Sequence, residues 1–323
     1  MRRAVIIDTD PGYDDAIAIL LAAQHFNILG LTTIFGNESI ENTTQNALNL
    51  LDYCGLSGIP VAKGAEFPLI QKLTPGGGSS IHGKNGLETP LLTQTKNQAH
   101  PNHAVDFIIE NAMLQKDLTL IPVGPLTNIA LALLKAPAIK EHIKEICIMG
   151  GSVTLGNASP VAEVNIWCDP EAAHIVFNSG IHIKMVGLNV TYSAMATPDR
   201  RDRFQQLTNK VGRLASDIID RYSSNYTKIY NYPGAALHDP CAVAWLIDPS
   251  IIEGMPAHMD IELHGQLTRG MTVCDLRPPR NIKPSKGDEN APRVRKPANG
   301  EVALKINADR FFDLLYSTLE QYP

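Results

Sequence analysis

Short apolar segments alternate along the chain with longer segments whose apolar positions recur every three or four residues. The short segments have the length of strands and fall at 4–8, 28–36, 118–124, 145–151 and 182–188. The longer ones predict amphipathic helices at 14–26, 39–54, 102–115, 125–135 and 169–179. Near-continuous apolar strands separated by helices are typical of a mostly parallel sheet covered on both faces. The pattern therefore predicts an α/β fold with a Rossmann-like central sheet flanked by helices.

Three segments depart from this pattern. Residues 73–90 are rich in glycine, include His82, and predict a mobile loop without regular structure. Residues 277–297 are rich in proline and charge, and we interpret them as an irregular, solvated insertion between two strands rather than a nucleic-acid-binding segment. Residues 213–247 predict a long helix, a break at a Pro-Gly pair and a second helix that begins at the sequence HDP. Neither loop separates two self-sufficient cores, so we expect residues 1–323 to form one domain.

Composition and charge limit the possible partners. The 323-residue chain is 44% hydrophobic, enough for a sizeable core, and its net charge of −5 offers no basic field for nucleic acid or an anionic membrane. No apolar run is long enough to span a bilayer, and an aspartate at position 8 comes too early for a signal peptide. The five cysteines are scattered without a Cys-x-x-Cys pair, as in proteins with reduced thiols. We therefore expect a cytoplasmic protein that binds neither membranes nor nucleic acids.

Four aspartates, Asp8, Asp10, Asp14 and Asp15, crowd together at the end of the first predicted strand. Two carboxylates about 4 Å apart repel each other by roughly 4 kcal/mol at an effective dielectric constant near 20, whereas a helix dipole returns only ~0.3–1 kcal/mol per charge. Helix capping explains one or two of these aspartates, but a converging group must separate, take up a proton or bind a cation. Oxygen ligands without a nearby Cys or His favour Ca²⁺ or Mg²⁺ over Zn²⁺.

Polar residues also stand just after the other predicted strands. Asn37 follows the second strand, Thr127 opens a helix after a later one, and His238 and Asp239 open a helix near the end of the chain. A further group follows the strand at 145–151: Asn157, Glu163, Asn165 and Asp169. Each residue taken alone has a structural explanation, such as a helix N-cap or a turn. Their joint placement predicts a ligand site at the carboxyl edge of the sheet, where open α/β sheets bind ligands.

Four motifs resemble those of the nucleoside hydrolases, both the inosine–uridine-preferring type and its pyrimidine-selective relatives. The motifs are DTDPGYDDAIAIL, GPLTNIA, the segment from MGG to AEVNIWCDPEAA, and LHDPCAVAW, and they occur in the family's order. The resemblance runs from residue 4 to about 275 and resumes at 302–315. It implies the nucleoside hydrolase fold and Ca²⁺-dependent hydrolysis of the N-glycosidic bond of a ribonucleoside to ribose and free base. It also implies a homodimer or homotetramer.

The resemblance assigns roles around the sugar. Four groups would hold Ca²⁺: Asp10, Asp15, Asp239 and the main-chain carbonyl of Thr127. Asp10 would also be the general base for the attacking water. Asp8 would orient the site without touching the substrate. The remaining residues would bind the ribose: Asp14 and Asn165 at the 2′- and 3′-hydroxyls, Asn157 and Glu163 at the 5′-hydroxyl, and Asn37 and Met149 along the pocket wall. Anionic groups around the sugar also suit the oxocarbenium-like transition state of glycosidic cleavage.

The departing base needs a proton, and two histidines can supply one. His238 stands beside a metal ligand implied by the resemblance, and His82 lies in the glycine-rich loop, so both are candidates for the general acid. Tyr226 and Tyr230 lie four residues apart on one predicted helical face. Corresponding positions contact the base in the pyrimidine-selective branch, so the resemblance implies the same contact here.

The positions of the two tryptophans bear on the base preference. The purine-specific branch stacks tryptophans on the base, whereas Trp167 and Trp245 stand at positions that we interpret as structural. We therefore expect a pyrimidine or mixed preference.

Asn189 replaces the aspartate that the family usually carries in the segment GLNVT, and the sequence assigns it no role.

Two other functions fit parts of the sequence. The segment VIIDTD resembles the strand end of haloacid dehalogenase-like phosphatases, with Asp8 as nucleophile and Mg²⁺ as cofactor. That interpretation leaves Asp14 and Asp15 unexplained. The second alternative is a non-catalytic protein that binds Ca²⁺ and a nucleoside, although every catalytic position mapped from the family is occupied.

Overall fold

A central sheet of eight strands organises the chain in the computed structural model, which describes residues 2–71, 79–278 and 295–323. The strands lie in the order β3 (Val61–Lys63), β2 (Asn27–Thr33), β1 (Ala4–Thr9), β4 (Leu118–Pro122), β5 (Ile143–Met149), β6 (Ile183–Val186), β10 (Gly300–Ile306) and β7 (Ile252–Ala257). All neighbouring strands pair in parallel except β7, which runs antiparallel to β10 at one edge. A separate hairpin joins β8 (Met259–Ile261) to β9 (Thr272–Cys274).

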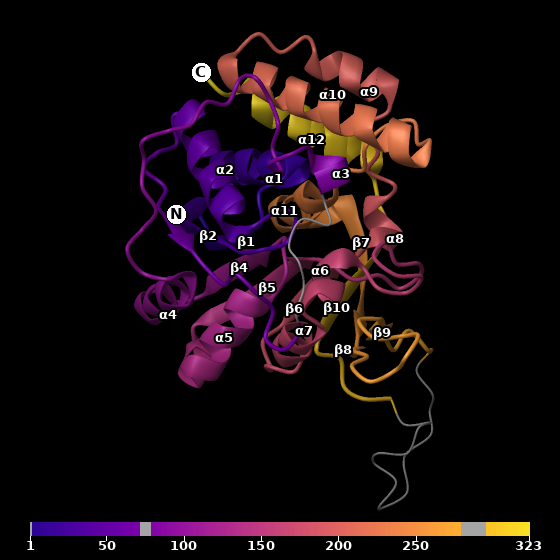
Figure 1. Cartoon of the computed structure of the whole chain (residues 1–323). Helices are drawn as coiled ribbons and strands as arrows, with labels where there is room; N and C mark the ends of the chain where they lie inside the picture. Colours follow the sequence, from indigo (N-terminus) through magenta and orange to yellow (C-terminus); the bar gives the residue numbers. More distant parts are fainter. Residues whose placement is uncertain (1, 72–78, 279–294) are drawn as a thin grey trace, which may run out of the picture.

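Helices cover both faces of this sheet, so the central strands are buried on both sides (Figure 1). Ile7 belongs to one hydrophobic core and its neighbour Ile6 to the other, as the alternation of side chains along a strand requires. The first core is covered by α1 (Tyr13–His25), α2 (Ile40–Tyr53), α10 (Lys210–Tyr230), α11 (His238–Ile247) and α12 (Ala308–Glu320). The second is covered by α4 (Ala104–Leu114), α5 (Thr127–Lys135) and α7 (Pro170–Phe177).

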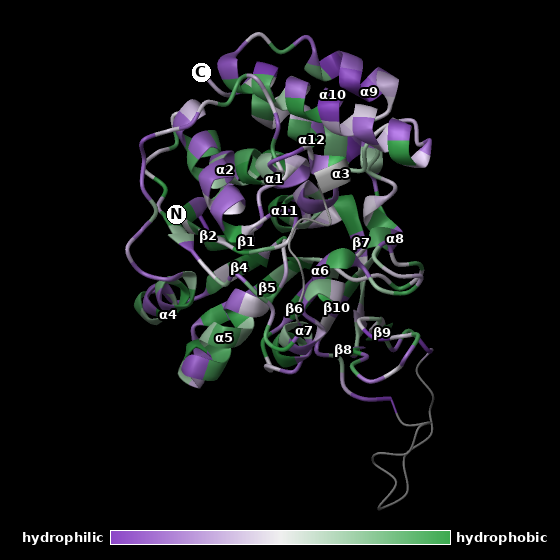
Figure 2. Cartoon of the chain, in the orientation of Figure 1, coloured by the Kyte–Doolittle hydropathy of each residue, from purple (hydrophilic) through white to green (hydrophobic). Residues whose placement is uncertain are grey.

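Helices α1 and α11 pack against each other in the interior of the first layer. Every residue of α1 from Tyr13 to Ala22 is buried, and α11 is buried from His238 to Leu246. Helices that are apolar on all sides belong in a core, whereas α10 carries hydrophilic and hydrophobic residues on different faces (Figure 2). The first turns of α1 and α11, which carry acidic residues, are therefore held in place by the packing of these two helices.

The predicted fold class and the order of its main elements are confirmed. The strand predicted at 28–36 is shorter, because β2 ends at Thr33 and the chain then turns along the sheet edge. The prediction that 73–90 lacks regular structure is wrong in the described part, where Ser79–His82 form a helical turn, α3. Residues 72–78 of that loop and 279–294 of the predicted insertion lie outside the described residues.

Shorter elements complete the chain: α6 (Val164–Cys168), α8 (Leu188–Thr191), α9 (Pro198–Phe204), and 3₁₀ turns at Pro137–Glu141 and Pro249–Ile251. Within the described ranges, no helix has the length and apolar character needed to cross a membrane.

Candidate active site

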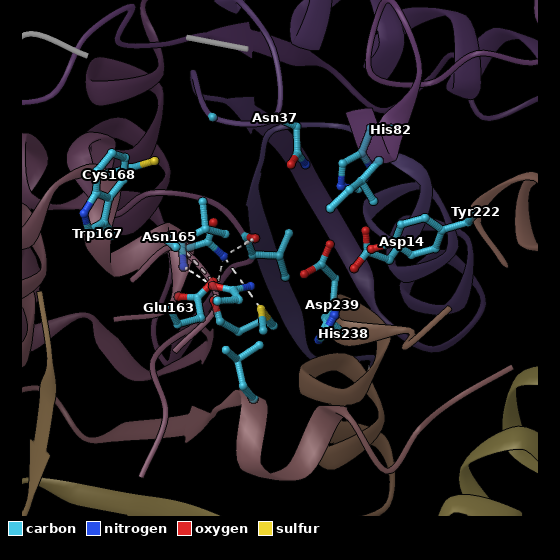
Figure 3. A pocket seen from close by; sticks show the side chains of 18 of the residues that line it. Asp14, Asn37, His82, Glu163, Asn165, Trp167, Cys168, Tyr222, His238 and Asp239 are labelled. Carbon is cyan, nitrogen blue, oxygen red and sulfur yellow. Dashed lines mark hydrogen bonds between the residues drawn. The ribbon is translucent and has the colours of Figure 1, made fainter. Parts of the chain in front are cut away.

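A cavity of about 450 Å³ opens at the carboxyl edge of the parallel strands (Figure 3). Asp10 follows β1, Asn37 lies in the loop after β2, Met149 ends β5 and Leu188 follows β6. Parallel strands bring these ends to one edge. All eight residues that the sequence assigned to substrate binding line the cavity: Asp14, Asn37, Met149, Asn157, Glu163, Asn165, Tyr226 and Tyr230. Both candidate acids, His82 and His238, line it as well.

An acidic cluster lies at the floor of this cavity: Asp14 and Asp239 line it, and Asp15 adjoins them without lining it. Carboxylate oxygens of Asp14, Asp15 and Asp239 lie within 4.8 Å of one another, and all three residues are buried. Asp14 and Asp15 belong to the first turn of α1, and Asp239 belongs to the first turn of α11. The packing of α1 against α11 therefore brings the third carboxylate to the first two. Asp14 was expected to bind ribose, but it lies in the same group as the two expected cation ligands.

The carboxylate of Asp15 is oriented by hydrogen bonds from its own turn. Its Oδ1 accepts from the Thr9 hydroxyl at 2.6 Å and from the Asp10 main-chain N–H at 3.2 Å. Its Oδ2 accepts from the Gly12 N–H at 2.9 Å. These donors lie between the strand end and the helix start, so the local turn fixes the direction of this side chain.

Asp10 lies directly beside this cluster in a narrow space between two glycines. A Cβ atom at Gly36 would lie 2.0 Å from Asp10 Oδ2, and one at Gly124 would lie 2.5 Å from Asp10 Oδ1. Asp10 is 2% exposed, and its Oδ1 has no hydrogen-bond partner among the described residues. A buried, unpaired carboxylate oxygen is costly unless a cation or a proton compensates it.

Burial raises the pKa of every carboxyl group in this region. The pKa of Asp14 rises to about 8, chiefly through burial and then through the charge of Asp15. Burial likewise raises the pKa values of Asp10, Asp15 and Asp239, and the neighbouring carboxylates add to the rise for Asp10 and Asp239. A divalent cation with oxygen ligands fits this donor set, because it would neutralise groups that otherwise hold protons.

A second wall of the cavity carries the groups expected at the sugar. Glu163 caps α6, with Oε1 accepting from the Asn165 N–H at 3.0 Å and Oε2 accepting from the Gly151 N–H at 2.9 Å. The Asn165 side-chain amide donates to the carbonyls of Val123 at 2.9 Å and Met149 at 3.1 Å. These bonds leave the Asn165 side-chain oxygen available as an acceptor. Burial raises the pKa of Glu163 to about 7.

The two histidines lie in different hydrogen-bonding environments. His82 Nδ1 accepts from the Tyr13 N–H at 3.1 Å, so the ring proton is on Nε2. His238 Nδ1 lies 2.7 Å from the Thr191 hydroxyl, and its Nε2 lies 2.8 Å from the Tyr226 hydroxyl. Burial lowers the pKa of His238 to about 4, and burial together with His238 lowers that of His82 to about 3. Both rings are therefore neutral near pH 7.

Tyr222 is a cavity residue that the sequence did not identify. It is 2% exposed, lines the cavity beside Asp14, and its hydroxyl forms a hydrogen bond that lowers the pKa of that carboxyl group. Its ring lies 5.0 Å from that of Tyr226 and 5.1 Å from that of His82. The sequence did contain a signal for Tyr222: it stands four residues before Tyr226, so Tyr222, Tyr226 and Tyr230 lie on one face of α10.

Trp167, interpreted from the sequence as structural, packs against the small hydrophobic cluster of Ile34, Phe35 and Cys168 and also lines the cavity; Figure 3 shows it beside Cys168. Trp245 is 2% exposed in the first core, as expected. The substituted Asn189 bridges two segments: its amide donates to the Ala303 carbonyl at 2.9 Å. Its side-chain oxygen accepts from the Val153 N–H at 3.3 Å.

Five predicted or candidate residues lie outside the cavity lining: Asp8, Asp10, Asp15, Thr127 and Asp169. Asp8 is 1% exposed, and its Oδ1 accepts from the Thr32 hydroxyl at 2.5 Å and the Asn128 amide at 2.8 Å. With its Oδ1 engaged by donors from β2 and α5, the buried Asp8 carboxylate is poorly placed as a phosphatase nucleophile. Asp169 caps α7 and accepts a hydrogen bond from the Thr127 hydroxyl at 2.7 Å.

The fold and this site are those of an α/β enzyme with a buried acidic cluster beside a cavity at the carboxyl edge of its sheet. Over residues 5–313 the chain matches the family described as inosine-uridine preferring nucleoside hydrolase. The chain belongs to this family and is a ribonucleoside hydrolase.

Three similar proteins are described as nucleoside hydrolases with different base preferences. An inosine-uridine preferring nucleoside hydrolase from Crithidia fasciculata is 40% identical, over 99% of this chain and 98% of its own length. A pyrimidine-specific ribonucleoside hydrolase, RihA, from Shewanella sp. (strain MR-7) is 38% identical, over 100% of this chain and 98% of its own. The solved structure of a purine-preferring ribonucleoside hydrolase from Gardnerella vaginalis is 33% identical, covers 98% of both chains and superposes with a TM-score of 0.88.

Proposed function

We propose that this enzyme hydrolyses uridine, cytidine and inosine in a Ca²⁺-dependent reaction that releases ribose and the free base. The observation that carries the proposal is the buried cluster of Asp14, Asp15 and Asp239 at the floor of a cavity of about 450 Å³. Three buried carboxylates need protons or a cation to compensate their charge, and a bound cation would let all three ionise at neutral pH. Among the described residues that line the cavity there is no Lys or Arg, which favours an uncharged nucleoside over a phosphorylated one.

The proposed cation ligands are Asp10, Asp15, Asp239 and the main-chain carbonyl of Thr127. A bound Ca²⁺ supplies positive charge that neutralises the carboxylates and makes a nearby water more acidic. Asp10 is the proposed general base, since its Oδ1 is unpaired and beside the acidic cluster. With the cation bound, this carboxylate is ionised and takes the proton from the attacking water.

The proposed ribose subsite lies between the acidic cluster and the opposite wall. Asp14 and the side-chain oxygen of Asn165 are acceptors for the 2′- and 3′-hydroxyls, while Asn157 and Glu163 face the 5′-hydroxyl. Met149 and Asn37 complete the wall. Acceptors on both sides of the sugar position the reacting carbon and stabilise positive charge that develops on the ring.

The proposed proton donor to the base is the His238–Tyr226 pair. The two side chains are hydrogen-bonded to each other and both line the cavity. The Tyr226 hydroxyl gives its single proton to the departing base, and a hydrogen bond from Nε2–H of the neutral His238 ring stabilises the negative charge left on the tyrosine oxygen, so no imidazolium needs to be stored beforehand. His82 carries its proton on Nε2, and we propose that it donates a hydrogen bond to the bound base. Tyr230, which is 46% exposed at the cavity, completes the proposed base contact.

The mixed base preference is supported by the relatives, one described as inosine-uridine preferring and one as pyrimidine-specific. A panel of ribo- and deoxyribonucleosides, assayed for free base with and without EDTA and with added Ca²⁺, tests the proposal. Uridine, cytidine and inosine should be cleaved only when Ca²⁺ is present, and 2′-deoxyuridine should be cleaved poorly because it lacks a hydroxyl at the cation. Equal rates on uridine and deoxyuridine, or full activity in EDTA, would contradict it.

Two further parts belong to the proposal: a cytoplasmic location, which rests on the composition and the scattered cysteines, and a homodimer or homotetramer, which the family resemblance implies. Light scattering coupled to size-exclusion chromatography tests the assembly. A monomer at assay concentration would be the contrary result.

A further inference from the structure

We propose that Asn37 is a positioning residue that clamps Asp10 and Asp15 together, in addition to forming part of the sugar pocket. The inference rests on the proposed function, because the two aspartates are proposed ligands of the cation. Asn37 lies in the loop after β2, while both aspartates lie in the segment between β1 and α1. Two neighbouring segments of the sheet edge are therefore joined through this one side chain.

Three hydrogen bonds from Asn37 reach the two aspartates. Its main-chain N–H donates to Asp10 Oδ2 at 2.7 Å. Its side-chain Nδ2 donates to the Asp10 main-chain carbonyl at 3.1 Å and to Asp15 Oδ2 at 3.2 Å. Both amide hydrogens are thus engaged with acceptors of the acidic segment.

The partners also determine which way the amide group faces. A reversed amide would place its oxygen against the Asp10 carbonyl and the Asp15 carboxylate, and all three are acceptors. The observed orientation leaves Asn37 Oδ1 as the side-chain atom available to a ligand in the cavity. Asn37 can therefore accept a hydrogen bond from a hydroxyl group of the substrate or from water, but it has no side-chain N–H left to donate.

The hydrogen bonds from Asn37 orient the carboxylate of Asp10, the proposed general base. Asp10 Oδ2 is held by the Asn37 main chain, which leaves Oδ1 as the carboxylate oxygen without a partner. Asp15 is held from its own turn by Thr9 and Gly12. Asn37 lies outside the segment from β1 to α1, and among the described residues there its side chain is the one that bonds to both aspartates. It therefore fixes their relative positions.

Substitution Asn37→Asp gives a sharp test. The new side chain keeps an acceptor of the same shape toward the cavity, but it replaces the donating amide with an oxygen that repels both aspartates. A residue that served only as a pocket wall would tolerate this change. A clamp would not, and partners of metal ligands typically contribute about 10- to 100-fold to metal affinity.

Calorimetric titration of the purified enzyme with CaCl₂ provides the readout independently of turnover. We expect Asn37→Asp and Asn37→Ser to weaken Ca²⁺ binding by about 10-fold or more, with the smaller effect for serine, whose hydroxyl can still donate one hydrogen bond. The control is Asn157→Asp, which adds the same charge to the cavity wall without contacting the two aspartates; it should change Ca²⁺ affinity by less than about threefold. Circular dichroism melts confirm that each variant is folded.

The outcomes separate the inference from the proposed function. If the wild-type enzyme binds no Ca²⁺, the cation proposal fails. If it binds Ca²⁺ and Asn37→Asp binds equally tightly, the clamp is wrong and the cation proposal stands. An equal loss in Asn37→Asp and Asn157→Asp would assign the effect to a general disturbance of the cavity wall and would also overturn the clamp.

Discussion

The hydroxyl of Tyr226 lies 2.8 Å from Nε2 of His238, and the two residues belong to different helices. Tyr226 comes from the last part of α10, and His238 opens α11. The other ring nitrogen of His238 is paired with the Thr191 hydroxyl, so the imidazole is held from both sides. A ring that is fixed in this way and has a pKa near 4 is a neutral partner for the tyrosine throughout the physiological pH range.

Removal of the Tyr226 hydroxyl should slow cleavage of nucleosides whose base leaves poorly. We expect Tyr226→Phe to reduce kcat on uridine by roughly 100-fold, a typical contribution of a positioned acid. Cleavage of p-nitrophenyl β-D-riboside should fall by less than about threefold, because its leaving group departs as a stable anion without a proton. Steady-state kinetics on both substrates measure the difference. An equal loss on the two substrates would indicate that Tyr226 shapes the cavity and does not take part in proton transfer.

Calcium binding should weaken as the pH falls. Burial raises the pKa of Asp14 to about 8 and raises those of Asp10, Asp15 and Asp239, so the cation-free cluster holds protons near neutral pH. A cation must displace these protons, and its apparent affinity should therefore be lower at pH 6 than at pH 8. Calorimetry in two buffers of different ionisation enthalpy measures the protons released. An affinity independent of pH would contradict this coupling.

A methyl group at Gly124 should disable the site. Its Cβ would lie 2.5 Å from Asp10 Oδ1, so Asp10 would have to move. A shift of about 1 Å in a reacting group can cost on the order of 100-fold in rate, and we expect at least that loss of kcat/KM for Gly124→Ala. The matched control is Gly58→Ala, where a Cβ meets nothing within 4 Å. Wild-type activity in Gly124→Ala would show that Asp10 is not confined as described.

The cation-free enzyme should become less stable as the pH rises from about 6.5 to about 8. The folded-state pKa values of Asp8 and Glu163 are about 7 and that of Asp14 is about 8, all raised by burial, so the folded state binds protons that the unfolded chain has released. The unfolding free energy then falls with pH, on the order of 1 kcal/mol per pH unit for each such group. Added Ca²⁺ should reduce the fall, because the cation replaces the proton in the cluster.

Urea denaturation in EDTA at several pH values measures this dependence. His82 and His238, whose pKa values are lowered from 6.5 by burial, bind fewer protons in the folded than in the unfolded state near pH 6.5; they oppose the fall there and no longer contribute near pH 8. A stability that rises over this range without Ca²⁺ would contradict the assignment of the carboxyl groups.

The strands were predictable because the central strands of a parallel sheet are buried on both faces. Such strands must be apolar almost without interruption, as the segment 4–8 is, and that pattern is visible in the sequence alone. The polar residues at the strand ends were predictable for the same reason, since the apolar pattern stops where each strand leaves the core. Asn37 and Asn165 are examples, although the bonds made by their amides were not predictable.

Contacts between distant helices could not be predicted from the pattern. The approach of Asp239 to Asp14 depends on how α11 packs against α1, which no local periodicity encodes. Tyr222 lies on an amphipathic helix whose buried face also contains ordinary core residues, so its hydrogen bond to Asp14 had no separate signal. Trp167 lies one turn after the cap of the short helix α6, and its exposure to the cavity depends on the direction in which that turn faces.

The late position of α11 in the sequence has a consequence for synthesis of the enzyme. Until Asp239 has been synthesised, the nascent chain carries only two members of the cluster, Asp14 and Asp15. These two carboxylates can remain hydrated and apart. The complete acidic cluster forms when α11 docks onto α1, after most of the sheet has been synthesised. The proposed cation would therefore be captured chiefly by finished molecules, and chains that end before Asp239 would lack the third carboxylate of the cluster.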